Sequence, residues 1–156
     1  MAISLRPITK ENWVQCAELQ VAEGQENFVM PNVWSLAQAG VDPVRVPLAI
    51  YDDEVMVGFI MYNDKPLDDG TYRISRVLID RAHQGKGYGR AAVIEVIERM
   101  RQIPDCKEIT LEYSPQNKVA EHLYTSLGFE PVGSAWYGDI EEVVTRLRLS
   151  PECEEG

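Results

Sequence analysis

The stretch RVLIDRAHQGKGYGRAAVIEVIERMR, residues 76–101, constrains the fold more than any other part of this sequence. An apolar run leads into a loop with three glycines in five positions, and a helical pattern follows in which Val93, Val96 and Met100 share one face. Free N–H groups at a helix N-terminus bind anions, and glycines let a ligand approach the backbone closely. The stretch therefore predicts a strand, a phosphate-binding loop and a helix from residue 87 to residue 101.

Two familiar phosphate loops do not fit this stretch. A Walker A loop needs Ser or Thr directly after its lysine, whereas Lys86 is followed by Gly87. A dinucleotide fingerprint would use Gly87, Gly89 and Ala92 with Glu112 as the ribose-binding acid, but too little chain follows for a two-halved nucleotide domain. A glycine-rich turn that binds no ligand stays open at this point.

The order of the apolar and helical patterns predicts an α/β fold of the mixed (α+β) kind. Strands are expected at residues 2–8, in a hairpin at 45–64, at 71–80 and 107–113, and in two closing segments within 129–149. Helices are expected from the N-cap Thr9 to Gly24, from Pro31 to Gly40, and at 87–101 and 117–128. Helices alternate with strands only in mid-chain, which predicts a mixed sheet with helices on both faces.

Length and composition predict one soluble domain, residues 1–150, followed by a disordered acidic tail, residues 151–156. The net charge of −10 predicts no nucleic-acid partner and an attraction for small cations, with simple solubility as the alternative reading. No apolar run approaches the ~20 residues that cross a bilayer, so no membrane partner is expected. Cys16, Cys106 and Cys153 form no CxxC pair or Cys/His cluster, which predicts a cytoplasmic protein without a bound metal.

A second motif, NKVAEHLYTSLGF, occupies residues 117–129. Ala120, Leu123, Tyr124 and Leu127 recur at the spacing of one helix face, so Tyr124 is directed inward. Asn117 stands at the expected N-cap of this helix. From the residues alone, Tyr124 is either a core aromatic whose hydroxyl finds a partner or a functional tyrosine.

Together, QGKGYG at residues 84–89 and NKVAEHLYTSLGF resemble the acetyl-CoA loop and the second signature of the GNAT N-acetyltransferase superfamily. The two motifs stand in the superfamily's order, with one helix and one strand between them. The resemblance implies a GNAT-like fold, a mostly antiparallel sheet of about seven strands that splays between the two strands flanking the loop. It also implies transfer of an acetyl group from acetyl-CoA to a primary amine, and a homodimer.

The same resemblance implies the residues that bind acetyl-CoA. Backbone groups near Val77 and Ile79 would bind the acetyl oxygen and the pantetheine arm, and N–H groups of residues 84–89 would hold the pyrophosphate. The implied contacts are Val77, Leu78, Ile79, Gln84, Gly85, Lys86, Gly87, Tyr88, Gly89, Arg90 and Asn117. Tyr124 matches the superfamily's usual proton donor to the departing thiolate.

The general base is not fixed by the sequence. Some superfamily members carry a glutamate early in the strand before the loop, where this chain has Arg73. Glu112 is a candidate that acts directly or through water, with a plain exposed strand carboxylate as its alternative. Asp80 is expected to order the turn into the loop, and His83 and His122 are weaker candidates.

The acceptor site is expected near the first two helices. The segments AEGQENFVMPNVWSLAQAG, IYDDEVMVGFIMY, CKEITLEYSPQN and YGDIEEV are similar to bacterial spermine/spermidine acetyltransferases. This looser resemblance implies a polyamine acceptor with contacts from Glu26, Phe28 and Glu112. Further candidate contacts are Glu23, Asp52, Asp53, Glu54, Trp34 and Tyr72. Another amine (a protein N-terminus, an antibiotic or an amino acid) and a CoA-binding regulatory module without turnover both stay open.

Overall fold

The computed structural model describes residues 2–21 and 31–149. The strands are β1 Ile3–Pro7, β2 Arg45–Asp52, β3 Val55–Asn63, β4 Ile74–Ile79, β5 Glu108–Tyr113, β6 Glu130–Tyr137 and β7 Ile140–Arg148. The helices are α1 Trp13–Ala17, α2 Asn32–Val41, α3 Tyr88–Arg101 and α4 Lys118–Ser126, with a short 3₁₀ turn η1 at Arg81–His83. The order of strands and helices is the one that the sequence predicts. The predicted tail, Gly24, Glu23, Glu26 and Phe28 lie outside the described residues.

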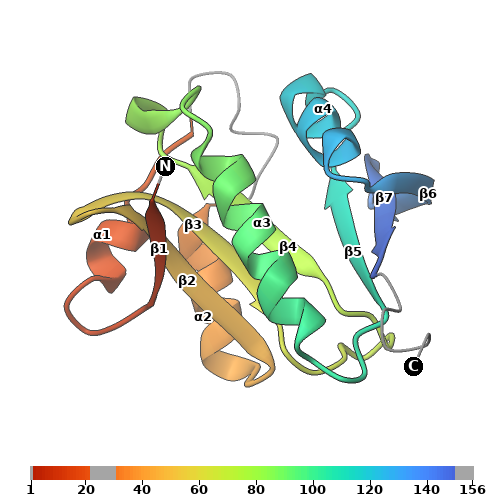
Figure 1. Ribbon diagram of the computed structural model, residues 1–156, viewed down its shortest axis with the longest axis horizontal. Coiled ribbons are helices and arrows are strands. Elements are labelled where there is room, and N and C mark those ends of the chain that lie inside the picture. The colour runs from red at the N-terminus through yellow and green to blue at the C-terminus, as the bar shows by residue number, and fades with distance from the viewer. Residues whose placement is uncertain (1, 22–30, 150–156) are drawn as a thin grey trace.

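The first four strands form an antiparallel sheet in the order β1-β2-β3-β4. β2 and β3 make the predicted hairpin, and the turn between them is closed by Asp53 in the left-handed region at φ 53°. Almost every β3 residue is buried because helices cover both faces of this sheet. Helix α3 packs on one face, as Figure 1 shows, while Cys16 of α1 and Leu36 of α2 pack against Phe59 and Met61 on the other.

The last three strands form a second antiparallel sheet in the order β5-β7-β6. A single parallel bridge, Arg73 to Thr110, joins it to the first sheet, with the Thr110 N–H donating to the Tyr72 carbonyl at 2.9 Å. Past this bridge, β4 and β5 share no further pairing in the described part of the chain and diverge (Figure 1). The predicted splay is confirmed, and the seven strands form sheets of four and three rather than one continuous sheet.

Two helices differ from their predicted bounds. Helix α1 spans only Trp13–Ala17, and its N-cap position is Asn12 rather than Thr9. Asn12 Oδ1 accepts from the Thr9 N–H at 2.7 Å, and the Thr9 carbonyl accepts from Trp13, so residues 9–12 form a turn before the helix. Helix α2 follows Pro31 as predicted but runs one residue past Gly40.

Helix α4 ends at the predicted glycine. Gly128 takes φ 100°, a conformation that a side chain disfavours. Its N–H donates to the Thr125 carbonyl, and the N–H of Phe129 donates to the Tyr124 carbonyl, both at 3.0 Å. This pair of bonds is a Schellman motif, which satisfies the last carbonyls of the helix and turns the chain into β6.

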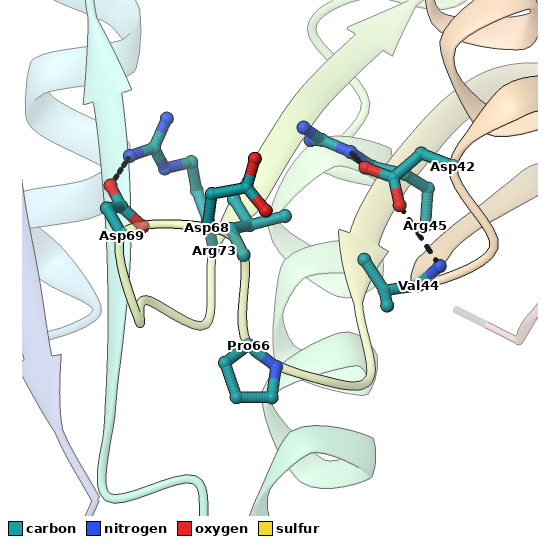
Figure 2. Close-up of a pocket in the computed structure, with 8 residues that line it drawn as sticks. Asp42, Val44, Arg45, Pro66, Asp68, Asp69 and Arg73 are labelled. Carbon is teal, nitrogen blue, oxygen red and sulfur yellow. Dashed lines mark hydrogen bonds and ion pairs between the residues drawn. The ribbon is translucent and has the colours of Figure 1, made fainter.

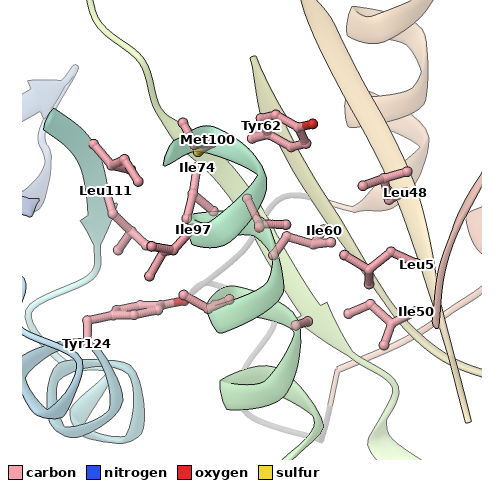
Figure 3. Close-up of a cluster of buried hydrophobic side chains, with 14 of the residues drawn as sticks. Leu5, Leu48, Ile50, Ile60, Tyr62, Ile74, Ile97, Met100, Leu111 and Tyr124 are labelled. Atoms are coloured by element: carbon pink, nitrogen blue, oxygen red, sulfur yellow. The ribbon is translucent and has the colours of Figure 1, made fainter. Parts of the chain in front are cut away.

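The main core lies under α3 and crosses both sheets. Val93, Val96 and Met100 are fully buried, as the periodicity of the helix predicts. Figure 3 shows side chains of β1, β2 and β3 facing α3 from one side, while Leu111 and Tyr124 approach it from the other. Burial of this apolar surface holds the two sheets together where backbone pairing between them stops. Among the described residues, no helix is long and apolar enough to cross a membrane.

Candidate active site

The glycine loop ends in an open helix N-terminus. Gly85 and Gly87 take φ 78° and 87°, and Gly87 is the N-cap residue of α3. The Ala91 N–H donates to the Gly87 carbonyl at 3.1 Å in the first turn of the helix. The N–H groups that precede it have no intrahelical acceptor, so those of Tyr88, Gly89 and Arg90 face the loop. This geometry suits an anion such as a pyrophosphate.

Side chains around the loop hold it in shape. The Asp80 carboxylate accepts from the N–H groups of Ala82 and Gln20, as expected for a residue that orders this turn. The Gln84 amide donates to the Ile79 carbonyl at 3.0 Å. Tyr88 is buried, and its hydroxyl donates to Asp52 at 2.5 Å, a hydrogen bond that raises the pKa of Tyr88. The side chain of Tyr88 therefore anchors the loop to β2 and leaves its N–H for a ligand.

The two predicted cationic contacts of the loop differ in their surroundings. Lys86 is exposed at the tip of the loop. Arg90 is exposed too, but its guanidinium donates to Ser126 Oγ at 2.7 Å and so ties α3 to the end of α4. Lys86 is thus the cation with the freer reach toward an anion at the helix N-terminus.

Strand β4 presents to the splay a backbone edge that pairs with no strand among the described residues, and its Ile79 carbonyl already accepts from the Gln84 amide. The Asp80 N–H donates to the Val57 carbonyl at 2.9 Å, which fixes which residues of β4 bond to β3. Because bonding alternates along an antiparallel strand, the N–H and C=O groups of Val77 and Ile79 point away from β3. Leu78 pairs with Phe59 and its side chain is buried, so the geometry does not support the predicted ligand contact by Leu78.

Tyr124 lies between the two sheets. It is 7% exposed, its ring stands 6.0 Å from the rings of Tyr113 and Phe129, and burial raises its pKa well above the ordinary value. Figure 3 shows the side chain reaching from α4 toward α3. Its hydroxyl makes no hydrogen bond within the described residues. Asn117 caps the helix as predicted, since its Oδ1 accepts from the Ala120 N–H at 3.1 Å.

Glu112 is not the plain exposed strand carboxylate that the sequence left as its alternative role. Its side chain is 13% exposed, its Oε1 accepts from the Tyr137 hydroxyl at 2.5 Å, and its Oε2 lies 3.6 Å from Arg73 Nη1. Leu111 and Tyr113 belong to the core beside Tyr124, and alternation along β5 directs Glu112 to the opposite face. Tyr124 and Glu112 therefore flank the splay from opposite sides.

The sequence analysis missed the polar residues around Glu112. Arg76 of β4 has a buried Nε without a hydrogen-bond partner in the described part of the chain, and burial lowers its pKa. Glu142 of β7 has a pKa raised by burial and then by Glu112. The alternation of side chains along β7 could have predicted Glu142, because it places Glu142 on the face opposite to that of Val143.

Other candidates lie apart from this gap. His122 is exposed, and His83 stands with its ring 6.3 Å from that of Tyr88. Tyr72 is a core residue, Trp34 is 62% exposed on α2, and Glu54 pairs with Arg6. Among the described residues, no three His, Cys, Asp or Glu side chains gather as a metal site.

A cavity of about 320 Å³ opens at the start of β4, the end remote from the glycine loop. Figure 2 shows its charged walls, in which Asp42 holds Arg45 at 3.2 Å and Asp69 holds Arg73 at 3.3 Å. Asp68 lines the same cavity. Arg73 thus links the cavity to Glu112.

The splayed sheets and the anion-binding glycine loop are the features expected of an acetyltransferase. The family model described as "Acetyltransferase (GNAT) family" matches residues 13–129, and the chain belongs to this family. It is an N-acetyltransferase.

The relatives agree with this assignment. The chain is 27% identical over 152 residues to a spermine/spermidine N(1)-acetyltransferase of Bacillus subtilis (strain 168), covering 94% of this chain and 100% of that protein. The solved structure of yncA, a putative acetyltransferase from Salmonella typhimurium with acetyl-CoA, has a TM-score of 0.70 at 20% identity, covering 97% and 96%. A spermidine N-acetyltransferase SpeG chimera from Vibrio cholerae and hSSAT has a TM-score of 0.73 at 16% identity, covering 95% and 96%.

Proposed function

We propose that this N-acetyltransferase acetylates a primary amine of a polyamine such as spermidine or spermine. The observation that carries the proposal is the pair Tyr124 and Glu112, which flank the splay from opposite faces of β5. A proton donor and a proton acceptor on opposite sides of one gap suit the direct attack of an amine on a thioester. The name of the Bacillus subtilis relative supports the polyamine as acceptor.

Acetyl-CoA supplies the thioester whose carbonyl carbon the amine attacks. The N–H groups at the start of α3 bind the pyrophosphate, and the outer edge of β4 holds the pantetheine arm. The Val77 N–H, which points away from β3, donates to the carbonyl oxygen as charge develops there. Loss of one such donor costs about 10²–10³ in rate in other enzymes. Asn117 lies at the start of α4 beside the end of β5.

Tyr124 protonates the departing thiolate. Burial keeps its phenol neutral because the raised pKa disfavours the phenolate, so a proton is available at Oη through the neutral and mildly alkaline range. Glu112 takes the proton that the attacking amine loses, directly or through one water. That proton must be removed because a free alkylammonium has a pKa near ~10.4.

The acidic chain, with a net charge of −10, supports a cationic acceptor. Glu26 and Phe28 stay predicted acceptor contacts outside the described residues. We also propose a cytoplasmic homodimer. β6 is an edge strand, and it exposes Val132 and Trp136 to 50% and 61%, a surface on which a second copy would bury apolar area.

The test is a panel of amines supplied with acetyl-CoA, with the release of free thiol as the readout. Saturable turnover on spermidine or spermine, without turnover on peptides, amino acids or aminoglycosides, is the expected result. Turnover on one of the other amines alone would replace the polyamine as acceptor. Binding of CoA without turnover on any amine would instead support a regulatory module.

A further inference from the structure

Arg73 holds two carboxylates that come from different parts of the chain. Its Nη1 lies 3.6 Å from Glu112 Oε2 on β5, and its Nη2 lies 3.3 Å from Asp69 Oδ2 in the loop before β4. Figure 2 shows the contact with Asp69 at the wall of the cavity. The guanidinium therefore stands between the cavity and the carboxylate that flanks the splay.

The contact with Glu112 is the looser of the two. A separation of 3.6 Å is longer than a hydrogen bond, so the pair is held by charge alone. The Nε of Arg73 is buried without a hydrogen-bond partner among the described residues. Glu112 keeps a second partner, the Tyr137 hydroxyl, when Arg73 moves away. Separating Arg73 from Glu112 thus breaks no hydrogen bond between the two, although Arg73 also gives up its contact with the Tyr137 hydroxyl.

The Arg73 guanidinium has alternative acidic partners at the cavity wall. Asp69, with a side chain 57% exposed, already accepts a hydrogen bond from its Nη2. Asp68 lines the same cavity and makes no ion pair or hydrogen bond within the described residues. A guanidinium that leaves Glu112 stays paired at the cavity wall, so its positive charge remains compensated.

We propose that Arg73 occupies Glu112 in the absence of an acceptor and yields it to the ammonium group of the incoming amine. This inference rests on the proposed function. Two cations cannot share one carboxylate oxygen without repulsion, so the ammonium displaces the guanidinium toward Asp69 and Asp68. Arg73 is then an internal competitor that lowers the affinity for every cationic acceptor.

The experiment measures KM for spermidine, KM for acetyl-CoA and the calorimetric Kd for spermidine in Arg73→Gln. We expect both spermidine constants to fall roughly two- to fivefold, the scale of one weak, partly exposed ion pair. KM for acetyl-CoA should not change. Arg101→Gln is the matched control because it removes another arginine pair, Arg101 Nε to Glu98 at 3.3 Å on α3. Spermidine constants that are unchanged or raised in Arg73→Gln would overturn the inference.

Asp69→Asn tests the same competition through an exposed residue with little risk to folding. It weakens the second partner of Arg73, so the guanidinium should stay on Glu112 and the Kd for spermidine should rise. In Glu112→Gln, the added change Arg73→Gln should no longer tighten spermidine, because the contested charge is gone. An equal gain in both backgrounds would overturn the inference.

The failure of this inference differs from the failure of the proposed function. A wild-type enzyme that turns over no polyamine removes both. A wild-type enzyme that acetylates spermidine, with no tightening in Arg73→Gln, removes only the role of Arg73.

Discussion

Removal of the Tyr124 hydroxyl should lower the catalytic rate without changing the stability of the fold. The hydroxyl lies in a residue that is 7% exposed and makes no hydrogen bond within the described part of the chain. Tyr124→Phe keeps the ring and its contacts with the rings of Tyr113 and Phe129. The variant should therefore fold as the wild type does and lack only the proton of the phenol.

The expected change in the activation barrier of Tyr124→Phe is much larger than the expected change in its free energy of unfolding. Loss of a general acid lowers kcat by about 10²–10⁴, which is about 2.7–5.4 kcal/mol in the activation barrier. Loss of a hydroxyl that makes no hydrogen bond among the described residues changes the free energy of unfolding by less than about 1 kcal/mol. KM for acetyl-CoA should stay within twofold, because the N–H groups of α3 and the edge of β4 are untouched.

The pH dependence gives a second readout for Tyr124. Burial raises its folded-state pKa above the unfolded value of ~10. Above that value the unfolded chain releases this proton while the folded chain retains it, so the stability that Tyr124 contributes is lost as pH rises. The free energy of unfolding of Tyr124→Phe should therefore rise relative to the wild type above about pH 10, and the two should run parallel below it.

The assays are thiol release from acetyl-CoA with spermidine, and urea unfolding followed by circular dichroism. A kcat within threefold of the wild type would remove Tyr124 as the acid. A loss of more than 2 kcal/mol in stability would refute the reasoning in another way, since it would mean that the hydroxyl is paired.

Two further predictions concern glycines, and each has a matched control. Gly58→Ala puts a methyl group 2.5 Å from a backbone oxygen of β4. The variant should lower the free energy of unfolding in urea by about 1–3 kcal/mol and raise KM for acetyl-CoA. Its control Gly40→Ala meets nothing within 4 Å and should raise the free energy of unfolding by up to ~1 kcal/mol. Gly87→Ala strains a residue at φ 87° and should cost about 1–2 kcal/mol and raise KM for acetyl-CoA; Gly138→Ala, at φ 70° in the β6–β7 turn, should cost as much and leave KM alone. Equal effects on KM within the second pair would count against the loop as the pyrophosphate site.

Local sequence signals predicted most of the scaffold. Hydrophobic periodicity gave α3 its buried face and directed Tyr124 inward, and both are confirmed. Gly128 and Asn117 act as predicted at the two ends of α4. These features depend on residues a few positions apart, so a short window of sequence contains their whole physical cause. The first helix was predicted poorly because residues 9–12 form a turn, closed by Asn12 Oδ1 accepting from the Thr9 N–H, so the helix begins only at Trp13.

Only the tertiary structure decided which side chains contact the Glu112 carboxylate. Its partners are Arg73, which directly precedes β4, and Tyr137 of β6, which is 25 positions away in sequence. The register of β5 against β7 and the single bridge between Arg73 and Thr110 bring them together. Strand pairing over such separations is set by packing of the whole core rather than by any local preference. The sequence by itself determined the glycine loop, while the fold determined the charges that surround Glu112.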